Sequence, residues 1–133
     1  MKKIKADLLV IGAGSGGLVV ASGAAQLGAN VVLVEGDRMG GDCLNYGCVP
    51  SKALLAAANT AKQVNQSDKF GIKAEIVKLD YAEVMAYVEK KIAEIAPHDS
   101  QERFEEMGVT VLRDYAKFKD CLLYTSPSPR DDL

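Results

Sequence analysis

The segment GAGSGG, from Gly12 to Gly17, restricts the fold of this chain more than any other feature. It matches the pattern G-x-G-x-x-G, whose middle glycine is Gly14. Residues 4–11 before it are mostly apolar, and residues 15–27 after it follow a helical pattern. A short glycine turn between a strand and a helix is therefore predicted here.

A second apolar run completes the pattern. Gly28 ends the predicted helix, residues 31–34 read VVLV, and Glu35 follows directly. Both apolar runs have the composition of strands that are buried on both faces, as in a parallel sheet. The order strand, glycine turn, helix, strand and acid predicts a Rossmann-like α/β fold, in which helices flank a parallel sheet.

The same residues predict a dinucleotide site. Gly12 permits the tight turn, Gly14 lets the backbone approach a diphosphate, and Gly17 lets the helix pack closely on the turn. The helix N-terminus offers free N–H groups to phosphate oxygens. Glu35 follows Gly17 by eighteen residues, where an acid accepts hydrogen bonds from a ribose diol. The candidate residues are Gly12, Gly14, Ser15, Gly16, Gly17 and Glu35.

Two of the three cysteines, Cys43 and Cys48, lie five residues apart. On a regular helix this spacing separates the two Cα atoms by about 7.5 Å along the axis and about 140° around it. A disulfide needs Cα atoms roughly 4.4–6.8 Å apart, so the turn between the cysteines must be irregular, and Gly47 gives it the freedom. Pro50 suits the first turn of a helix expected over residues 51–62.

Three interpretations of the cysteine pair are open. The first is a reversible dithiol–disulfide beside the nucleotide, favoured by a helix N-terminus and by Lys52, which both stabilise a thiolate. The second is a pair of inert structural cysteines. The third is half of a zinc site, which needs four ligands, although the one histidine, His98, is distant in the sequence. We predict the first, and no metal site.

Together these residues resemble a known family. The segments VIGAGSGG and GGDCLNYGCVPSK, with Glu35 between them, are similar to the flavin-dependent pyridine nucleotide–disulfide oxidoreductases. That family includes dihydrolipoyl dehydrogenase, glutathione reductase and mercuric reductase. The resemblance extends from residue 4 to about residue 120, and its cysteine motif is highly specific.

The resemblance implies the cofactor and the residue roles. The glycine-rich site would hold FAD, with Glu35 on the adenosine ribose. Cys48 would lie against the flavin as the charge-transfer thiolate, Cys43 would be the interchange thiol that attacks the substrate, and Lys52 would lie near the flavin ring. Electrons can then pass from reduced flavin into the disulfide.

Gly41 and Asp42 complete the candidate cofactor-binding residues. Asp42 stands where the family commonly has threonine, so a charge replaces a hydroxyl beside the cofactor site. Tyr46 is larger than the residue often found there, and we assign it no chemistry.

The family also implies a reaction. NAD(P)H would reduce FAD, FAD would reduce the Cys43–Cys48 disulfide, and the dithiol would reduce a small-molecule disulfide or a thiol-bound metal such as Hg(II). Residues 95–109, IAPHDSQERFEEMGV, favour the mercuric reductase-like branch. Dihydrolipoyl dehydrogenase is the alternative within the family. A non-catalytic nucleotide-binding fragment is the alternative of another class, because the NAD(P)H site, the C-terminal His-Glu pair and the domain through which the family forms homodimers lie outside these residues.

Composition excludes some partners. A net charge of −2 over 133 residues gives no electrostatic basis for binding nucleic acid or an anionic membrane surface. No apolar run is long enough to span a membrane. Asp7 interrupts the segment that could resemble a secretory signal, so a cytoplasmic location is expected.

The rest of the chain predicts further elements of an incomplete domain. Asp80 is expected to cap a helix, with Glu83 as its capping-box partner. Pro97 should split this helix from a second one over residues 100–107, and residues 109–112 read as a strand that could join the sheet.

Residues 1–120 are therefore assigned to the N-terminal part of an FAD-binding domain. Residues 121–133 are assigned to a non-native tail, because CLLYTSPSPRD back-translates to DNA resembling a transposase mosaic end and sequencing adapter.

Overall fold

The sheet contains three parallel strands in the order β1-β2-β3 in a computed structural model that describes residues 4–118. Strand β1 is Leu8–Ile11, β2 is Val31–Val34 and β3 is Thr110–Leu112. The central strand β2 pairs with both neighbours, with Leu8 opposite Val31 and Val32 opposite Thr110. The predicted parallel α/β architecture is confirmed, including the late strand that joins the sheet.

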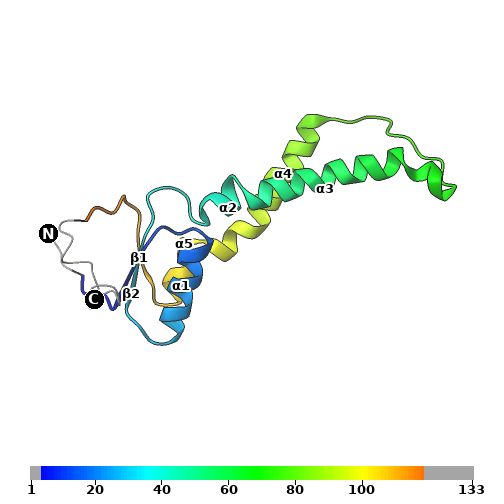
Figure 1. Ribbon diagram of the computed structural model, residues 1–133. Helices are drawn as coiled ribbons and strands as arrows, with labels where there is room; N and C mark the ends of the chain where they lie inside the picture. Colours follow the sequence, from blue (N-terminus) through cyan, green and yellow to red (C-terminus); the bar gives the residue numbers. More distant parts are fainter. Residues whose placement is uncertain (1–3, 119–133) are drawn as a thin grey trace, which may run out of the picture.

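One face of the sheet carries the hydrophobic core. Helix α1, Ser15–Gln26, and helix α5, Gln101–Glu106, lie together against this face (Figure 1). Because side chains alternate along a strand, the register directs one set of apolar residues toward these helices. The buried core cluster comprises Val10, Ala13, Leu18, Ala21, Val31, Leu33, Phe104, Val109 and Val111.

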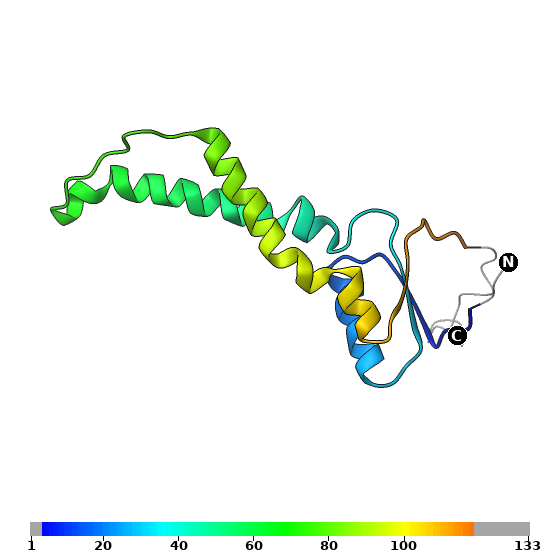
Figure 2. The same cartoon turned by 180° about the vertical axis from the view of Figure 1, so that it is seen from behind.

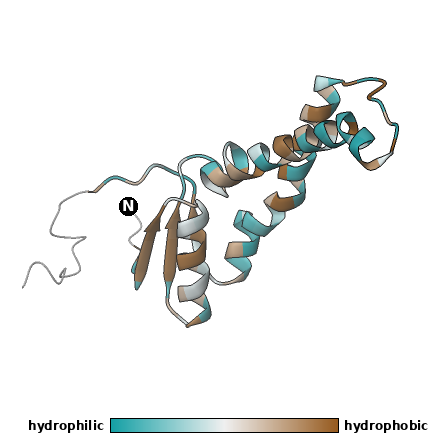
Figure 3. Ribbon diagram, turned by 45° about the vertical axis from the view of Figure 1, so that its right-hand side comes forward, coloured by the Kyte–Doolittle hydropathy of each residue, from teal (hydrophilic) through white to brown (hydrophobic). Residues whose placement is uncertain are grey.

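The opposite face is partly open, and here one prediction was wrong. Leu9 and Ile11 of β1 are 41% and 51% exposed, whereas all four residues of β2 are buried. The expected strand over residues 4–11 is also shorter, since it begins at Leu8. The strands are apolar on both faces (Figure 3), but among the described residues α1 and α5 pack only on the first face, so β1 is buried on one side.

A helical arm connects β2 to β3. The connection consists of α2 (Gly41–Asn45), α3 (Cys48–Asn65), η1 (Ser67–Phe70), α4 (Tyr81–Ile95), η2 (Ala96–Asp99) and α5. Helices α3 and α4 pack on each other and project away from the sheet, as the front and rear views both show (Figures 1 and 2). The base of this arm places α2 and the start of α3 beside the carboxyl ends of the strands, next to the glycine-rich turn.

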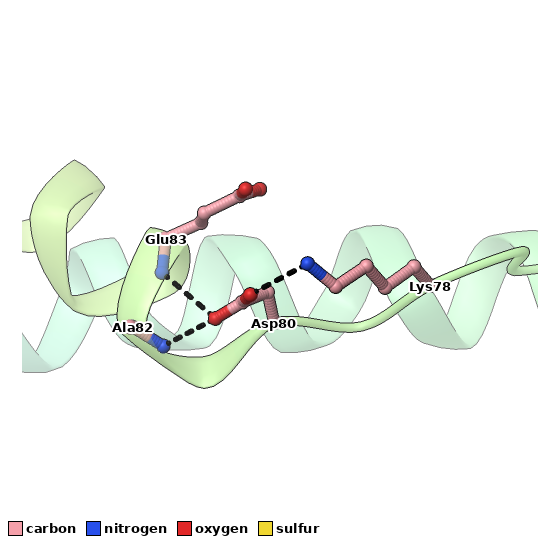
Figure 4. Close-up of polar contacts among 4 residues, drawn as sticks. All are labelled: Lys78, Asp80, Ala82 and Glu83. Carbon is pink, nitrogen blue, oxygen red and sulfur yellow. Dashed lines mark hydrogen bonds and ion pairs between the residues drawn. The ribbon is translucent and has the colours of Figure 1, made fainter.

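Helix α4 begins at the predicted cap. The Asp80 Oδ1 atom accepts hydrogen bonds from the backbone N–H groups of Ala82 at 3.0 Å and Glu83 at 3.4 Å. Lys78 Nζ lies 2.8 Å from Asp80 Oδ2, and this ion-paired hydrogen bond, followed by the two backbone bonds, lowers the pKa of Asp80. The side chain of Glu83 points away from Asp80 (Figure 4), so half of the expected capping box forms.

The predicted break near Pro97 is also present. Helix α4 ends at Ile95, and the 3₁₀ turn Ala96–Asp99 separates it from α5. Ser100 caps α5 by accepting the N–H of Arg103 at 3.3 Å. Helix α4 buries its apolar side chains only in part, since Val88 is 2% exposed whereas Tyr81 is 66% exposed.

Three further sequence predictions concern the segment before α4, the C-terminal tail and membrane-spanning helices. The short mixed segment over residues 70–79, whose sequence predicts a partly extended chain, contains no strand. The assigned tail at residues 121–133 lies outside the described residues. Within residues 4–118, no helix has the length and apolar character needed to cross a lipid bilayer.

Candidate functional site

The glycine-rich turn presents an uncapped helix end. The N–H of Gly12 donates to Val34 O at 2.8 Å, which holds the turn against β2. Helix α1 begins at Ser15, and its N-cap residue, Gly14, contributes no side-chain hydrogen bond. The first intrahelical bond, from Leu18 N–H to Gly14 O, is 2.9 Å long, so the N–H groups of the preceding turn have no intrahelical acceptor.

Two glycines of this turn border open space on their Cβ side. A Cβ atom added at Gly14 or Gly16 would meet no heavy atom within 4 Å. At Gly17, by contrast, a Cβ atom would lie 1.9 Å from Gly12 O and 3.3 Å from Val10 Cγ1. Gly17 therefore gives the close packing that the sequence pattern predicts, and the uncapped helix end with its free space fits a diphosphate.

Glu35 lies at the carboxyl end of β2 and is 9% exposed. Its Oε2 atom accepts the N–H of Ala13 at 2.5 Å, and its Oε1 atom accepts the N–H of Asp37 at 2.6 Å. The sequence pattern predicts a ribose acceptor at this position but gives no signal for these two backbone partners. The carboxylate thus links β2 to the glycine-rich turn.

The two cysteines lie on either side of a helix break. Cys43 is within α2, and Cys48 is the first residue of α3. Gly47 between them has φ −114° and ψ −104°, outside the helical region. The N–H groups of Tyr46 and Gly47 both donate to Asp42 O, at 2.8 and 2.6 Å. The predicted irregular turn is present, and α3 begins at Cys48, two residues before Pro50, so Pro50 lies in its first turn as expected.

The cysteine turn packs directly on the glycine-rich turn. Gly41, with φ +59°, lies so close that an added Cβ atom would be 2.6 Å from Gly14 Cα. The N–H of Gly40 also donates to Ala13 O at 2.9 Å. A glycine at position 41 therefore satisfies both the left-handed backbone and the close approach, and it joins the two predicted motifs into one site.

The two thiols interact with each other. Both are free, with Cys43 partly buried and Cys48 exposed. A side-chain hydrogen bond with Cys48, then burial, then the negative charge of the Cys48 thiolate raise the pKa of Cys43. A backbone hydrogen bond from Cys48 and the charge of Lys52 oppose this shift.

Several cavities lie along the arm, and two of them differ in the groups that line them. One, of about 340 Å³, is lined by Cys48 and Lys52 from α3 and by Tyr87 and Lys91 from α4, among others. A larger one, of about 530 Å³, lies between α3 and residues 76–87 and includes neither cysteine. The smaller cavity contains the reactive groups, because it is lined by the thiol of Cys48 and the ammonium groups of Lys52 and Lys91.

Other polar residues surround the site. Asp42 is exposed, and its carboxylate packs against Gly47: a Cβ atom added at Gly47 would lie 2.8 Å from Asp42 Oδ2.

Tyr46 and His98 have other partners. Tyr46 donates its hydroxyl to Asp37 Oδ2 at 3.4 Å, and the Arg38 guanidinium lies 5.6 Å from the Tyr46 ring centroid. The backbone carbonyl of His98 accepts from the guanidinium of Arg103. Among residues 4–118, no three His, Cys, Asp or Glu side chains gather as a metal site would require.

Comparison with known proteins identifies this arrangement. The family model described as "Pyridine nucleotide-disulphide oxidoreductase" matches residues 6–121. The chain belongs to this family. Dihydrolipoyl dehydrogenase of Geobacillus stearothermophilus is 50% identical over 84 residues, which are 63% of this chain and 18% of that protein. Dihydrolipoyl dehydrogenase of Haloferax volcanii is 40% identical over 114 residues, which are 86% of this chain and 24% of that protein.

The matched part of this chain thus spans about a quarter or less of the length of these relatives. The family couples FAD and a pyridine nucleotide to a disulfide. The open, uncapped N-terminus of α1 and the adjoining cysteine turn are chemically suited to that cofactor, since one can receive a diphosphate and the other can exchange electrons as a dithiol.

Proposed function

We propose that this chain supplies the FAD-binding turn and the redox-active dithiol of an NAD(P)H-dependent disulfide oxidoreductase. The observation that carries the proposal is the contact between Gly41 and Gly14, which seats the Cys43–Cys48 turn directly on the glycine-rich turn. A dithiol held at that position is within reach of a dinucleotide bound at the same turn.

In this proposal the chain holds the cofactor through named groups. The first-turn N–H groups of α1, from Ser15 to Gly17, bind the diphosphate, and Glu35 accepts the ribose hydroxyls. Lys52, which lines the same cavity as Cys48, and Gly41 and Asp42, which adjoin the glycine-rich turn, would contribute to the flavin end of the site. When bound, FAD supplies two-electron transfer between a nicotinamide and a disulfide.

The dithiol performs the exchange with substrate. Cys43, once it loses its proton, attacks one sulfur of a disulfide RSSR and releases RS⁻, which takes up a proton. Cys48 then attacks the mixed disulfide, releases the second thiol and forms the Cys43–Cys48 disulfide. Two thiols are produced for one disulfide formed in the protein, so two electrons pass to the substrate. The raised pKa of Cys43 makes its deprotonation part of this step.

Two acceptors are proposed for the dithiol. The names of the relatives favour a lipoyl disulfide. The segment over residues 95–109 favours a thiol-bound metal such as Hg(II), as the sequence analysis predicts. The identity to dihydrolipoyl dehydrogenases makes the lipoyl group the first choice.

A chimera tests the proposal. Residues 4–118 of this chain replace the corresponding segment of the Geobacillus stearothermophilus enzyme, and NADH-dependent reduction of lipoamide and NADPH-dependent reduction of Hg(II) are measured. Both activities should disappear in Cys43→Ser and Cys48→Ser variants, while FAD remains bound. A chimera that binds FAD and reduces lipoamide equally well without Cys48 would refute the assigned dithiol.

The chain by itself tests the alternative that it is a non-catalytic nucleotide-binding fragment. The 133-residue protein is predicted to show no turnover, even if FAD binds, so steady NADPH-dependent disulfide reduction by it would contradict the fragment alternative. Homodimer formation and a cytoplasmic location stay predictions for a longer protein that carries this chain.

A further inference from the structure

We propose that Glu35 strengthens diphosphate binding by holding the glycine-rich turn in place, in addition to any contact with a ribose. The inference rests on the proposed function, since it assigns a second role to a residue of the FAD site. It goes beyond that function because the ligand group concerned, the diphosphate, need not touch Glu35.

Three hydrogen bonds fix the turn in the structure. Gly12 N–H donates to Val34 O, and Ala13 O accepts from Gly40 N–H. The third runs from Ala13 N–H to Glu35 Oε2 at 2.5 Å and joins residues 22 positions apart. Of these three bonds, only the third depends on a side chain, so it is the one that a substitution can remove.

The position of this bond connects it to the ligand site. Ala13 is fully buried and immediately precedes Gly14, the N-cap of α1. The orientation of the Ala13 peptide therefore sets the direction of the free N–H groups that follow it. Because Glu35 is only 9% exposed, its charge-assisted bonds to Ala13 and Asp37 lie where solvent competes weakly with them.

Electrostatics alone predicts the opposite effect. A carboxylate near a diphosphate repels it, so removing the charge of Glu35 should tighten anion binding. A tether predicts weaker binding, because the turn loses one of its three fixed points. The ribose role is compatible with the tether, since each carboxylate oxygen has a second lone pair that can accept a hydroxyl.

A pair of ligands separates the two roles. Adenosine diphosphate and 2′,3′-dideoxyadenosine diphosphate are titrated into the 133-residue chain and its Glu35→Ala variant by calorimetry. The tether predicts that Glu35→Ala weakens the dideoxy nucleotide by about tenfold, the scale of one charge-assisted hydrogen bond. An unchanged affinity for the dideoxy nucleotide, with weaker binding of the diol nucleotide, would show that Glu35 acts on the ribose only and would overturn the inference.

Asp37→Asn is the matched control for charge. Asp37 lies two residues from Glu35, and its carboxylate accepts from Tyr46 rather than from the turn. Its substitution should leave the affinity for both nucleotides within about twofold. A tenfold weakening in Asp37→Asn as well would show that the affinity falls with any substitution in this loop, and it would refute the tether.

The Ala13 amide provides a readout without nucleotide. Its proton resonance should move upfield in Glu35→Ala, while the amides of α3 stay in place and show that the fold is retained. If Glu35→Ala does not fold, Glu35→Gln takes its place, because it keeps the side-chain length and one acceptor oxygen. The two nucleotides are then titrated into Glu35→Gln, provided that the shifted Ala13 resonance shows that the bond to the turn is weakened. An unmoved Ala13 resonance in Glu35→Ala overturns the tether. A wild-type chain that binds neither nucleotide refutes the proposed FAD site itself, which the amide measurement does not depend on.

Discussion

Replacing Gly17 by alanine should strongly destabilise the chain. The added Cβ atom would lie 1.9 Å from Gly12 O, whereas a close carbon–oxygen contact is about 3.3 Å. The helix must therefore move by more than about 1 Å from the turn, and Leu18 and Ala21 lose packing in the core. Overpacking of this kind costs about 3 kcal/mol of unfolding free energy.

Gly23→Ala is the matched control in the same helix. Gly23 lies in the interior of α1, and an added Cβ atom there meets nothing within 4 Å. The substitution should stabilise the chain by about 0.5–1 kcal/mol because alanine loses less backbone entropy on forming a helix. The two variants should therefore differ by about 4 kcal/mol in urea unfolding followed by circular dichroism. A Gly17→Ala variant as stable as Gly23→Ala would refute the packing argument.

Two further predictions concern titrating groups. Cys48→Ala removes the hydrogen bond and the charge that raise the pKa of Cys43, so iodoacetamide should alkylate Cys43 at lower pH than in the reduced wild type; an unchanged pH midpoint by peptide mass mapping would contradict the thiol–thiol interaction. Asp80→Ala should lower the thermal midpoint more than Asp80→Asn, which keeps an N-cap acceptor. Because the pKa of Asp80 is lowered in the folded chain, the part of its stabilisation that depends on its charge is present above its unfolded pKa of about 3.9 and is lost as the pH falls through the lower folded value. A stability difference between wild type and Asp80→Ala that does not shrink in stronger acid would refute this assignment.

The elements that the sequence predicts correctly depend on local signals. The turn at Gly12–Gly17, the cap at Asp80 and the break at Pro97 each follow from backbone preferences of one or two residues. The parallel sheet follows from apolar runs separated by a helix. Such signals lie within a few residues of the structure that they determine.

The features that the sequence does not predict depend on distant neighbours. The exposure of Leu9 and Ile11 is set by which elements pack on the sheet, and composition alone does not contain that information. The bonds from Glu35 to Ala13 and Asp37, and the direction of the Cys43 pKa, likewise require side chains brought together by the fold. For the candidate site, the sequence names the residues and the structure adds their mutual contacts.

The helical arm also has a consequence for the order of folding. Leu8 pairs with Val31 across 23 positions, whereas Val32 pairs with Thr110 across 78. For flexible loops this difference adds about 1 kcal/mol to the entropy of closure. The β1–α1–β2 unit is therefore expected to assemble first. Helices α3 and α4, by packing on each other, shorten the connection that β3 must close, so formation of the arm would control when the third strand joins the sheet.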